Sequence, residues 1–140
     1  MRITIVGSSK FMKEMIEFRD KLNVMGHEAI VHQTYVNWVN GKELDLHKRL
    51  EKEHAKIKRE LDVFKWYHNA IANSDAILVL NFDKNGIENY IGGNTLIEMG
   101  FAHVNDKKVF LLNPVPEIGY KDEILALTDK VLNGDLSQIN

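Results

Sequence analysis

The five consecutive apolar residues AILVL at 76–80 constrain the fold more than any other stretch of the chain. A run of this length without polar alternation is typical of a strand covered on both faces, as the central strands of parallel sheets are. Similar runs occur at 2–7 (RITIVG) and 108–112 (KVFLL). The chain therefore predicts a parallel sheet that lies between layers of helices.

The segments between these runs have the spacing of amphipathic helices. Residues 11–26 place apolar side chains three and four positions apart and end at a glycine, as a helix does. The stretch 33–45 has no clear period. Further elements are expected at 27–32 (strand), 46–73 (one helix or two), 94–105 (helix), 122–128 (short helix) and 130–132 (edge strand).

This alternation predicts a single α/β domain over residues 1–140. We expect a flavodoxin-like or Rossmann-like parallel sheet of about five strands, with helices on both faces. Ligands of such sheets bind beyond the carboxyl ends of the strands, where the strand order reverses. The loops at 7–10, 81–94 and 113–116 are therefore expected to border a site.

Composition excludes several classes of function. Eighteen basic residues against twenty acidic ones give a net charge of -2, which provides no general attraction for polymeric nucleic acid or an anionic membrane. The absence of cysteine excludes a disulfide framework and a thiolate nucleophile. No apolar run has the length of a signal or membrane segment, so a cytoplasmic location is expected.

Three side chains with helical spacing raise the possibility of a metal site. His47, Glu51 and His54 could share one face of a helix. The surrounding run is rich in charges and is more simply explained as a solvated helix. We expect no metal and no other cofactor.

The first loop, Gly7, Ser8, Ser9 and Lys10, contains the groups that bind anions. It supplies backbone N–H groups before a helix, two hydroxyls and one ammonium group. Turn and helix-cap chemistry explains the same residues about equally well. The loop has neither the P-loop pattern nor the three spaced glycines of a dinucleotide site, so ATP hydrolysis and NAD chemistry are disfavoured.

A second loop reaches the same rim of the predicted sheet. Gly92, Gly93, Asn94 and Thr95 open a helix, and Glu98 follows Asn94 by about one turn. Glu98 is either a solvated residue or a carboxylate that points into a pocket. Because its neighbours in sequence are mostly apolar, and an unpaired buried carboxylate is costly, the pocket is favoured.

Other polar and aromatic residues are candidates for ligand contacts. Asn81 and Asp83 follow the strand at 76–80 and could hydrogen-bond a base or ribose, although turn chemistry explains them nearly as well. Trp38, Trp66 and Tyr90 could stack on a base, or pack in the core or at a subunit interface.

Four segments together resemble a known family. In order, they are GSSKF (7–11), SDAILVL (74–80), GGNTLIEMGFA (92–102) and KKVFLLNP (107–114). They are similar to the nucleoside 2-deoxyribosyltransferase family and its relatives, the 5′-monophosphate N-glycosidases of (deoxy)nucleotides. The most specific part is Thr95 with Glu98 three residues later. A partial similarity to phosphoribohydrolases, one residue short of their glycine-rich signature, points to the same N-glycosidic bond.

The resemblance implies roles for the residues of both loops. Glu98 would be the nucleophile that attacks the anomeric carbon and forms a covalent glycosyl ester. Gly7, Ser8 and Ser9 would contact the ligand from the first loop, and residues 92–95 would hold ribose or phosphate. The substrate would be a (deoxy)nucleoside or its 5′-monophosphate. Hydrolysis of a monophosphate is slightly favoured over base transfer, because the first loop suits a phosphate.

The sequence departs from the family at the proton donor. The family places an Asp about two helical turns before the third strand, where this chain has Tyr67 beside His68. Either of these residues takes over proton delivery, or the chain is a nucleotide-binding or sensing module without turnover. The resemblance also implies a homodimer or larger assembly in which residues 113–120 of a neighbour complete the pocket.

Overall fold

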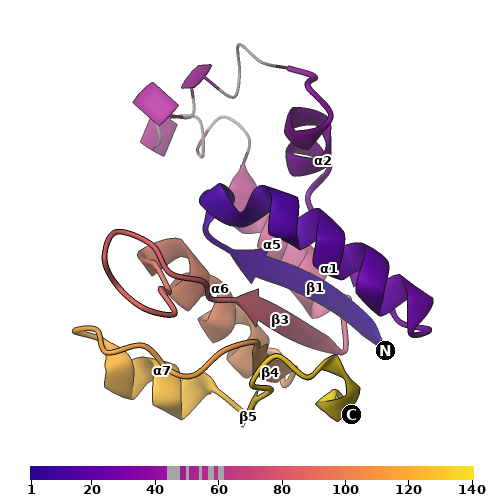
Figure 1. Ribbon diagram of the computed structural model, residues 1–140, viewed down its shortest axis with the longest axis vertical. Helices are drawn as coiled ribbons and strands as arrows, with labels where there is room; N and C mark the ends of the chain where they lie inside the picture. Colours follow the sequence, from indigo (N-terminus) through magenta and orange to yellow (C-terminus); the bar gives the residue numbers. More distant parts are fainter. Residues whose placement is uncertain (44–47, 50, 54, 57–58, 60–61) are drawn as a thin grey trace.

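The computed structural model describes residues 1–43, 48–49, 51–53, 55–56, 59 and 62–140, and contains a five-stranded parallel sheet (Figure 1). Its strand order is β2-β1-β3-β4-β5. This is the flavodoxin-like order, with its switch point between β1 and β3. The predicted fold class is therefore confirmed. The strands are β1 (Arg2–Gly7), β2 (Glu28–Ile30), β3 (Ala76–Leu80), β4 (Lys108–Leu111) and β5 (Lys130–Val131).

Helices lie on both faces of the sheet, with α1 on one side of β1 and α5 and α6 on the other (Figure 1). The helices are α1 (Met12–Val24), α2 (Gln33–Val39), α5 (Val63–Ala72), α6 (Gly93–Val104) and α7 (Lys121–Leu127), with 3-10 turns η1 (Ser9–Phe11) and η2 (Leu136–Gln138). The helix predicted at 11–26 is thus divided into η1 and α1, and the one predicted at 94–105 is α6.

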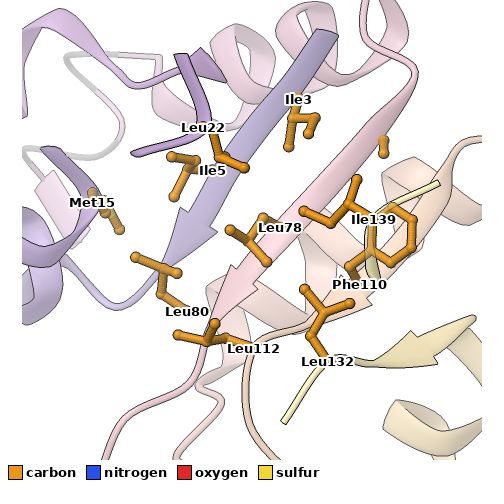
Figure 2. Close-up of a cluster of buried hydrophobic side chains, with 11 residues drawn as sticks. Ile3, Ile5, Met15, Leu22, Leu78, Leu80, Phe110, Leu112, Leu132 and Ile139 are labelled. Atoms are coloured by element: carbon orange, nitrogen blue, oxygen red, sulfur yellow. The ribbon is translucent and has the colours of Figure 1, made fainter. Parts of the chain in front are cut away.

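One face of the sheet is covered by α1 and the C-terminal segment. Leu78 and Leu80 of β3 point to this face, where they meet Met15 of α1 and Ile139 near the C-terminus (Figure 2). Both leucines are at most 1% exposed. Alternate residues of β3 therefore serve two cores, as its unbroken apolar sequence predicts.

The opposite face is covered by α5, α6 and α7. Ile77 and Val79 of β3 pack here against Ile71 of α5, Met99 of α6 and Ile124 of α7. Helix α6, which carries the Thr95 and Glu98 of the sequence motif, is thereby fixed against the middle of the sheet by its apolar side.

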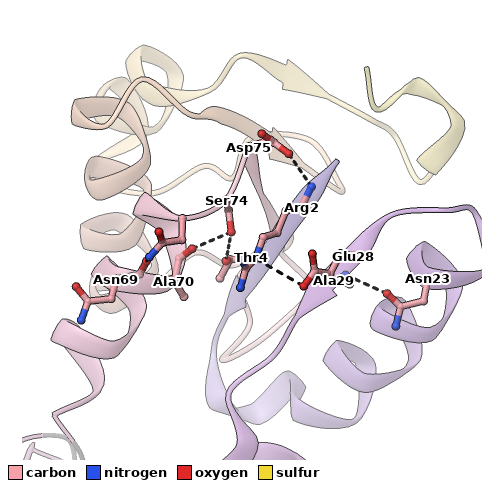
Figure 3. A network of polar contacts seen from close by, with 10 residues as sticks. Arg2, Thr4, Asn23, Glu28, Ala29, Asn69, Ala70, Ser74 and Asp75 are labelled. Carbon is pink, nitrogen blue, oxygen red and sulfur yellow. Dashed lines mark hydrogen bonds and ion pairs between the residues drawn. The ribbon is translucent and has the colours of Figure 1, made fainter.

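Polar contacts join α5 to β1 at the end of the sheet opposite the switch-point loops. Ser74 donates a hydrogen bond to the carbonyl of Ala70 and shares a buried 2.7 Å hydrogen bond with Thr4 (Figure 3). The carboxylate of Asp75 accepts a 2.7 Å bond from the backbone N–H of Arg2. Asp75 therefore lies at the junction between α5 and β3 and ties it to the start of β1.

Two regions differ from the sequence prediction. The strand predicted at 27–32 has only three residues, because His32 already caps α2: its Nδ1 accepts a 3.1 Å bond from the N–H of Thr34. Helix α2 itself was not predicted. Of the helical pattern at 46–73, the described part includes α5, and several residues of 46–61 lie outside the described residues.

Candidate functional site

A cleft of about 890 Å³ lies beyond the carboxyl ends of β1 and β3, at the switch point of the sheet. Its walls come from the first loop, the start of α1, α2, the loop after β3 and the start of α6. The described residues that line it are Gly7, Ser8, Ser9, Lys10, Met12, Lys13, Glu14, Tyr35, Glu51, Val63, Phe64, Lys84, Tyr90, Gly92, Gly93, Asn94, Thr95 and Glu98. The two predicted loops are therefore brought together, as the fold requires.

The first loop owes its path to Gly7. A Cβ at this position would lie 2.9 Å from the carbonyl oxygen of Leu80, a distance that real Cβ atoms do not tolerate. Ser8 follows and caps η1, where its Oγ accepts a 3.3 Å bond from the N–H of Lys10. The backbone of β1 thus passes close to β3 and then turns the Ser8 hydroxyl toward the cleft.

The loop after β3 brings Lys84 to the same hydroxyl. Lys84 Nζ donates a 2.9 Å hydrogen bond to Ser8 Oγ and lies 5.0 Å from the centre of the Tyr90 ring. Burial, with a smaller contribution from the charge of Lys10, lowers the pKa of Lys84. An anion near these ammonium groups would relieve their mutual repulsion. We call Ser8, Lys10 and Lys84 the cationic part of the cleft.

A tight turn positions Lys84. Asn85 and Gly86 have φ values of 54° and 75°, and Lys84 and Ile87 exchange two 3.0 Å backbone hydrogen bonds. This is a two-residue hairpin of the type that Asn-Gly sequences favour. The turn holds the backbone of Lys84 in place, and the bond to Ser8 positions its ammonium group.

Asn81 and Asp83 support this loop and do not line the cleft. The buried Asn81 amide donates to the carbonyls of Asn113 and Pro114, and its oxygen accepts from the N–H of Asn113. Asp83 accepts a 3.0 Å bond from the N–H of Asn89. The Asn81 amide and one Asp83 oxygen thus bond within the loop, and neither residue is among the described residues that line the cleft.

The start of α6 forms the floor of the cleft. Gly92 precedes the helix in an extended conformation, and a Cβ there would lie 3.1 Å from the Tyr90 hydroxyl. Gly93, Asn94 and Thr95 follow on the cleft wall, where Thr95 is 2% exposed. The first N–H groups of a helix are suited to an oxyanion, so this floor complements the cationic part.

Glu98 lies on the cleft wall and is 4% exposed. The charge of Glu98 affects the pKa values of two tyrosines. Burial, followed by the Glu98 carboxylate, raises the pKa of Tyr35, and burial, Tyr35 and Glu98 raise the pKa of Tyr67. The Tyr67 hydroxyl donates a hydrogen bond to Tyr35. We call Glu98, Tyr35 and Tyr67 the carboxylate part of the site.

The two candidate proton donors lie in different places. Tyr67 is a core residue, 2% exposed, and reaches the cleft only through Tyr35. His68 is exposed on α5, where its ring packs edge-on against Phe101 at 5.2 Å and approaches the amide of Asn105. The structure does not bring His68 to the cleft, because successive residues of a helix point in different directions.

Tyr90, one of the three aromatic residues that could stack on a base, lines the cleft, whereas Lys84, Glu14 and Tyr35 line it without having been singled out in the sequence. Lys84 lies in a loop that was expected to border the site, but no local motif distinguishes it from other loop residues. Glu14 shares its spacing with ordinary helix-surface residues. Tyr35 lies in α2, which was not predicted, although Tyr35, Trp38 and Val39 do have a helical spacing that could have indicated it.

Glu51 is the one member of the candidate metal trio that lies within the described residues. Within the described ranges, no three His, Cys, Asp or Glu side chains are grouped as metal ligands. His47 and His54 of the proposed metal trio lie outside the described residues. In the same ranges no helix has the length and apolarity to cross a membrane.

The fold and the cleft together define a flavodoxin-like α/β protein with a cleft at the switch point of its sheet. No protein-family model matches the chain, and no curated protein matches it. Among solved structures it is similar to the CMP N-glycosidase BcmB of Clostridium botulinum, with a TM-score of 0.52 and 15% identity over 93% of this chain and 85% of that chain. This similarity lies in the fold, and the similar structure is that of an N-glycosidase of a nucleoside monophosphate, an activity that the resemblance noted in the sequence also implies.

Proposed function

We propose that this protein binds a nucleoside 5′-monophosphate in the cleft and hydrolyses its N-glycosidic bond, with Glu98 as the nucleophile. One observation carries the proposal: a single cleft contains both a cationic part, at Ser8, Lys10 and Lys84, and a buried carboxylate, Glu98. A nucleotide has the matching pair of features, a phosphate and an electrophilic anomeric carbon. The neighbouring structure of a CMP N-glycosidase supports this substrate class.

The phosphate lies against the first loop in this proposal. The Ser8 hydroxyl accepts hydrogen bonds from Lys84 and from the backbone of Lys10. Its own O–H group can therefore donate a hydrogen bond to a third group. A phosphate oxygen is a suitable acceptor. The ammonium groups and the first turn of α6, which begins at Gly93, add favourable electrostatic interactions.

The reaction has two steps. One Glu98 oxygen bonds to the anomeric carbon while the bond to the base nitrogen breaks, and its electron pair leaves with the base. The base takes up a proton at that nitrogen. Water then adds to the same carbon, the ester bond returns its electron pair to Glu98, and the water's second proton is released.

Tyr35, supported by Tyr67, is our candidate for the proton delivered to the base. It lines the cleft beside Glu98, and its hydroxyl carries a proton at neutral pH, as that of any tyrosine does. The hydrogen bond from Tyr67 stabilises negative charge that develops on the Tyr35 oxygen. The proton released from water in the second step restores Tyr35. Proton delivery by His68 would require a change in the position of its side chain.

The proposal is tested by chromatography of free base released from ribo- and deoxyribonucleosides and their 5′-monophosphates. We expect release from a monophosphate by the wild type and none by Glu98→Gln. Glu123→Gln, which changes an exposed carboxylate of α7, is the control. Adding a second free base separates the two reactions: its incorporation into a nucleotide would indicate base transfer instead of hydrolysis.

The second candidate function is a nucleotide-binding or sensing module without turnover. Tyr67 favours it, because this residue lies where the family has an Asp, and its hydroxyl is buried behind Tyr35. If nucleotides raise the Tm of wild type and Glu98→Gln equally and neither protein releases base, the sensing module replaces the enzyme.

A further inference from the structure

Glu14, in the first turn of α1, provides a second carboxylate on the cleft wall. Its Oε2 atom is buried and has no hydrogen-bond partner among the described residues. The position in a first turn is favourable for its charge. That position does not explain why one oxygen is withdrawn from solvent without a donor, which is a costly arrangement for a carboxylate.

Aromatic residues flank Glu14 in the sequence. Phe11 lies three residues before Glu14 and Phe18 lies four after it, so the three side chains share one side of the helix. Both rings pack against Phe82, with ring centres 5.4 and 6.1 Å apart. Glu17, one turn later on α1, has its carboxylate 3.0 Å from Lys21 and more than half exposed. The same helix therefore carries one solvated, paired Glu and one Glu with a desolvated oxygen beside a ligand cleft.

We infer that the Glu14 carboxylate accepts a hydrogen bond from the bound ligand and so determines which nucleotides fit. This inference rests on the proposed function, since it assigns a contact within the same cleft. The group recognised is an uncharged donor, because a phosphate would be repelled by the carboxylate. A nucleotide carries two kinds of such donor: the hydroxyls of its sugar and the exocyclic amino group of its base.

Calorimetric titration of nucleotides in a Glu98→Gln background separates the two sources without turnover. The probes are cytidine 5′-monophosphate, its 2′-deoxy and 3′-deoxy analogues, and uridine 5′-monophosphate. Glu14→Gln and Glu14→Ala are compared with Glu17→Gln, the matched control. We expect both Glu14 variants to raise the Kd of the preferred nucleotide by about 10- to 100-fold, which is the range for a hydrogen bond to a charged group.

The pattern of the loss identifies the donor. If a sugar hydroxyl is the partner, removing it from the ligand and changing Glu14 have the same effect and do not add. If the base amino group is the partner, the Glu14 variants lose the preference for cytidine over uridine monophosphate. If the Glu14 variants bind all four nucleotides equally more weakly than before, or bind them as tightly as before, the inference is overturned and the proposed function stays intact. Failure of every nucleotide to bind any variant would overturn both.

Thermal unfolding of the free protein gives an independent test. An amide is less costly to bury than a carboxylate, so Glu14→Gln should raise the Tm while it weakens binding. Glu17→Gln should leave the Tm within the small range of surface substitutions. A lower Tm for Glu14→Gln would show that the carboxylate supports the fold, and would overturn the ligand role.

Discussion

The carboxylate part and the cationic part of the cleft are held in place by different kinds of structure. Glu98 projects from α6, whose other side packs into the core against β3. Lys84 projects from a loop whose shape depends on polar contacts and one tight turn. The comparison indicates that Glu98, the proposed nucleophile, is fixed by packing, whereas Lys84, the proposed phosphate contact, is fixed by a few hydrogen bonds. Substitutions in the two parts should therefore have distinguishable consequences.

The largest expected effect is on turnover by Glu98→Gln. Removing the nucleophile should lower kcat by at least about a thousandfold, as loss of a covalent catalyst does in other enzymes. The Kd of the nucleotide should change little, because the isosteric amide keeps the shape of the wall. Single-turnover base release and calorimetry measure the two quantities. A large loss of binding with normal turnover of bound nucleotide would reverse the assignment of the two parts.

Lys84→Met should act on affinity instead. Loss of one charge-assisted hydrogen bond predicts a KM for the monophosphate about 10- to 100-fold higher, with kcat nearly unchanged. The KM of the corresponding nucleoside, which has no phosphate, should stay the same. Steady-state kinetics on both substrates measure this difference. Lys107→Met, distant in the sequence and outside the cleft lining, is the control. An equal effect on both substrates would disprove the phosphate contact.

The buried tyrosine pair predicts a loss of stability at alkaline pH. The pKa values of Tyr35 and Tyr67 are raised in the folded protein, so their contribution is complete below pH 10, the unfolded pKa, and declines as the pH rises above it. Each group contributes a slope of up to about 1.4 kcal/mol per pH unit. Urea unfolding from pH 8 to 11 should give a shallower decline for Tyr67→Phe.

A cleft tyrosine outside the pair provides the control for that experiment. Tyr90→Phe removes a hydroxyl from the cleft wall and leaves both members of the pair in place. Its free energy of unfolding should decline with pH as steeply as that of the wild type. If Tyr67→Phe also shows the wild-type slope, the charge of Glu98 and the burial of the pair are not what links stability to pH.

The smallest effect is expected from the support of the Lys84 loop. Asp83→Ala removes the bond to the N–H of Asn89 and leaves Lys84 unchanged. Because a typical hydrogen bond contributes about 1 kcal/mol, the affinity for a monophosphate should fall by no more than about fivefold. Calorimetric titration with inorganic phosphate and with the nucleotide measures this change in affinity. A loss as large as that of Lys84→Met would mean that Asp83 itself contacts the ligand.

The sequence predicted features that depend on neighbouring residues. Strands β1 and β3 and helix α6 were predicted to within about one residue, because an apolar run or an apolar period decides them locally. Helix α2 was missed because Tyr35 contacts three separate apolar clusters, so no single apolar face marks it.

The candidate site was predicted in part for the same reason. Residues 92–95 and Glu98 come from one motif and line the cleft together. The hydrogen bond between Ser8 and Lys84 joins residues 76 positions apart, and no local pattern in the sequence predicts it. Asn81 was a candidate for a ligand contact because an amide can bond a ligand or a backbone equally well. Its bonds to Asn113, a residue 32 positions away, could not be predicted from the local sequence.

The closure of the loop after β3 by Asn81 has a consequence for how such a protein evolves. Reciprocal bonds between Asn81 and Asn113 close its base, and the Asn85-Gly86 turn forms its exposed tip. Tip residues can therefore be exchanged, inserted or lost without disturbing α6, where Glu98 lies. Related proteins that keep the bonds between Asn81 and Asn113 could therefore change the residues at the tip of the loop and still keep Glu98 in place. On the proposed function, single substitutions at the tip would then give new ligand preferences.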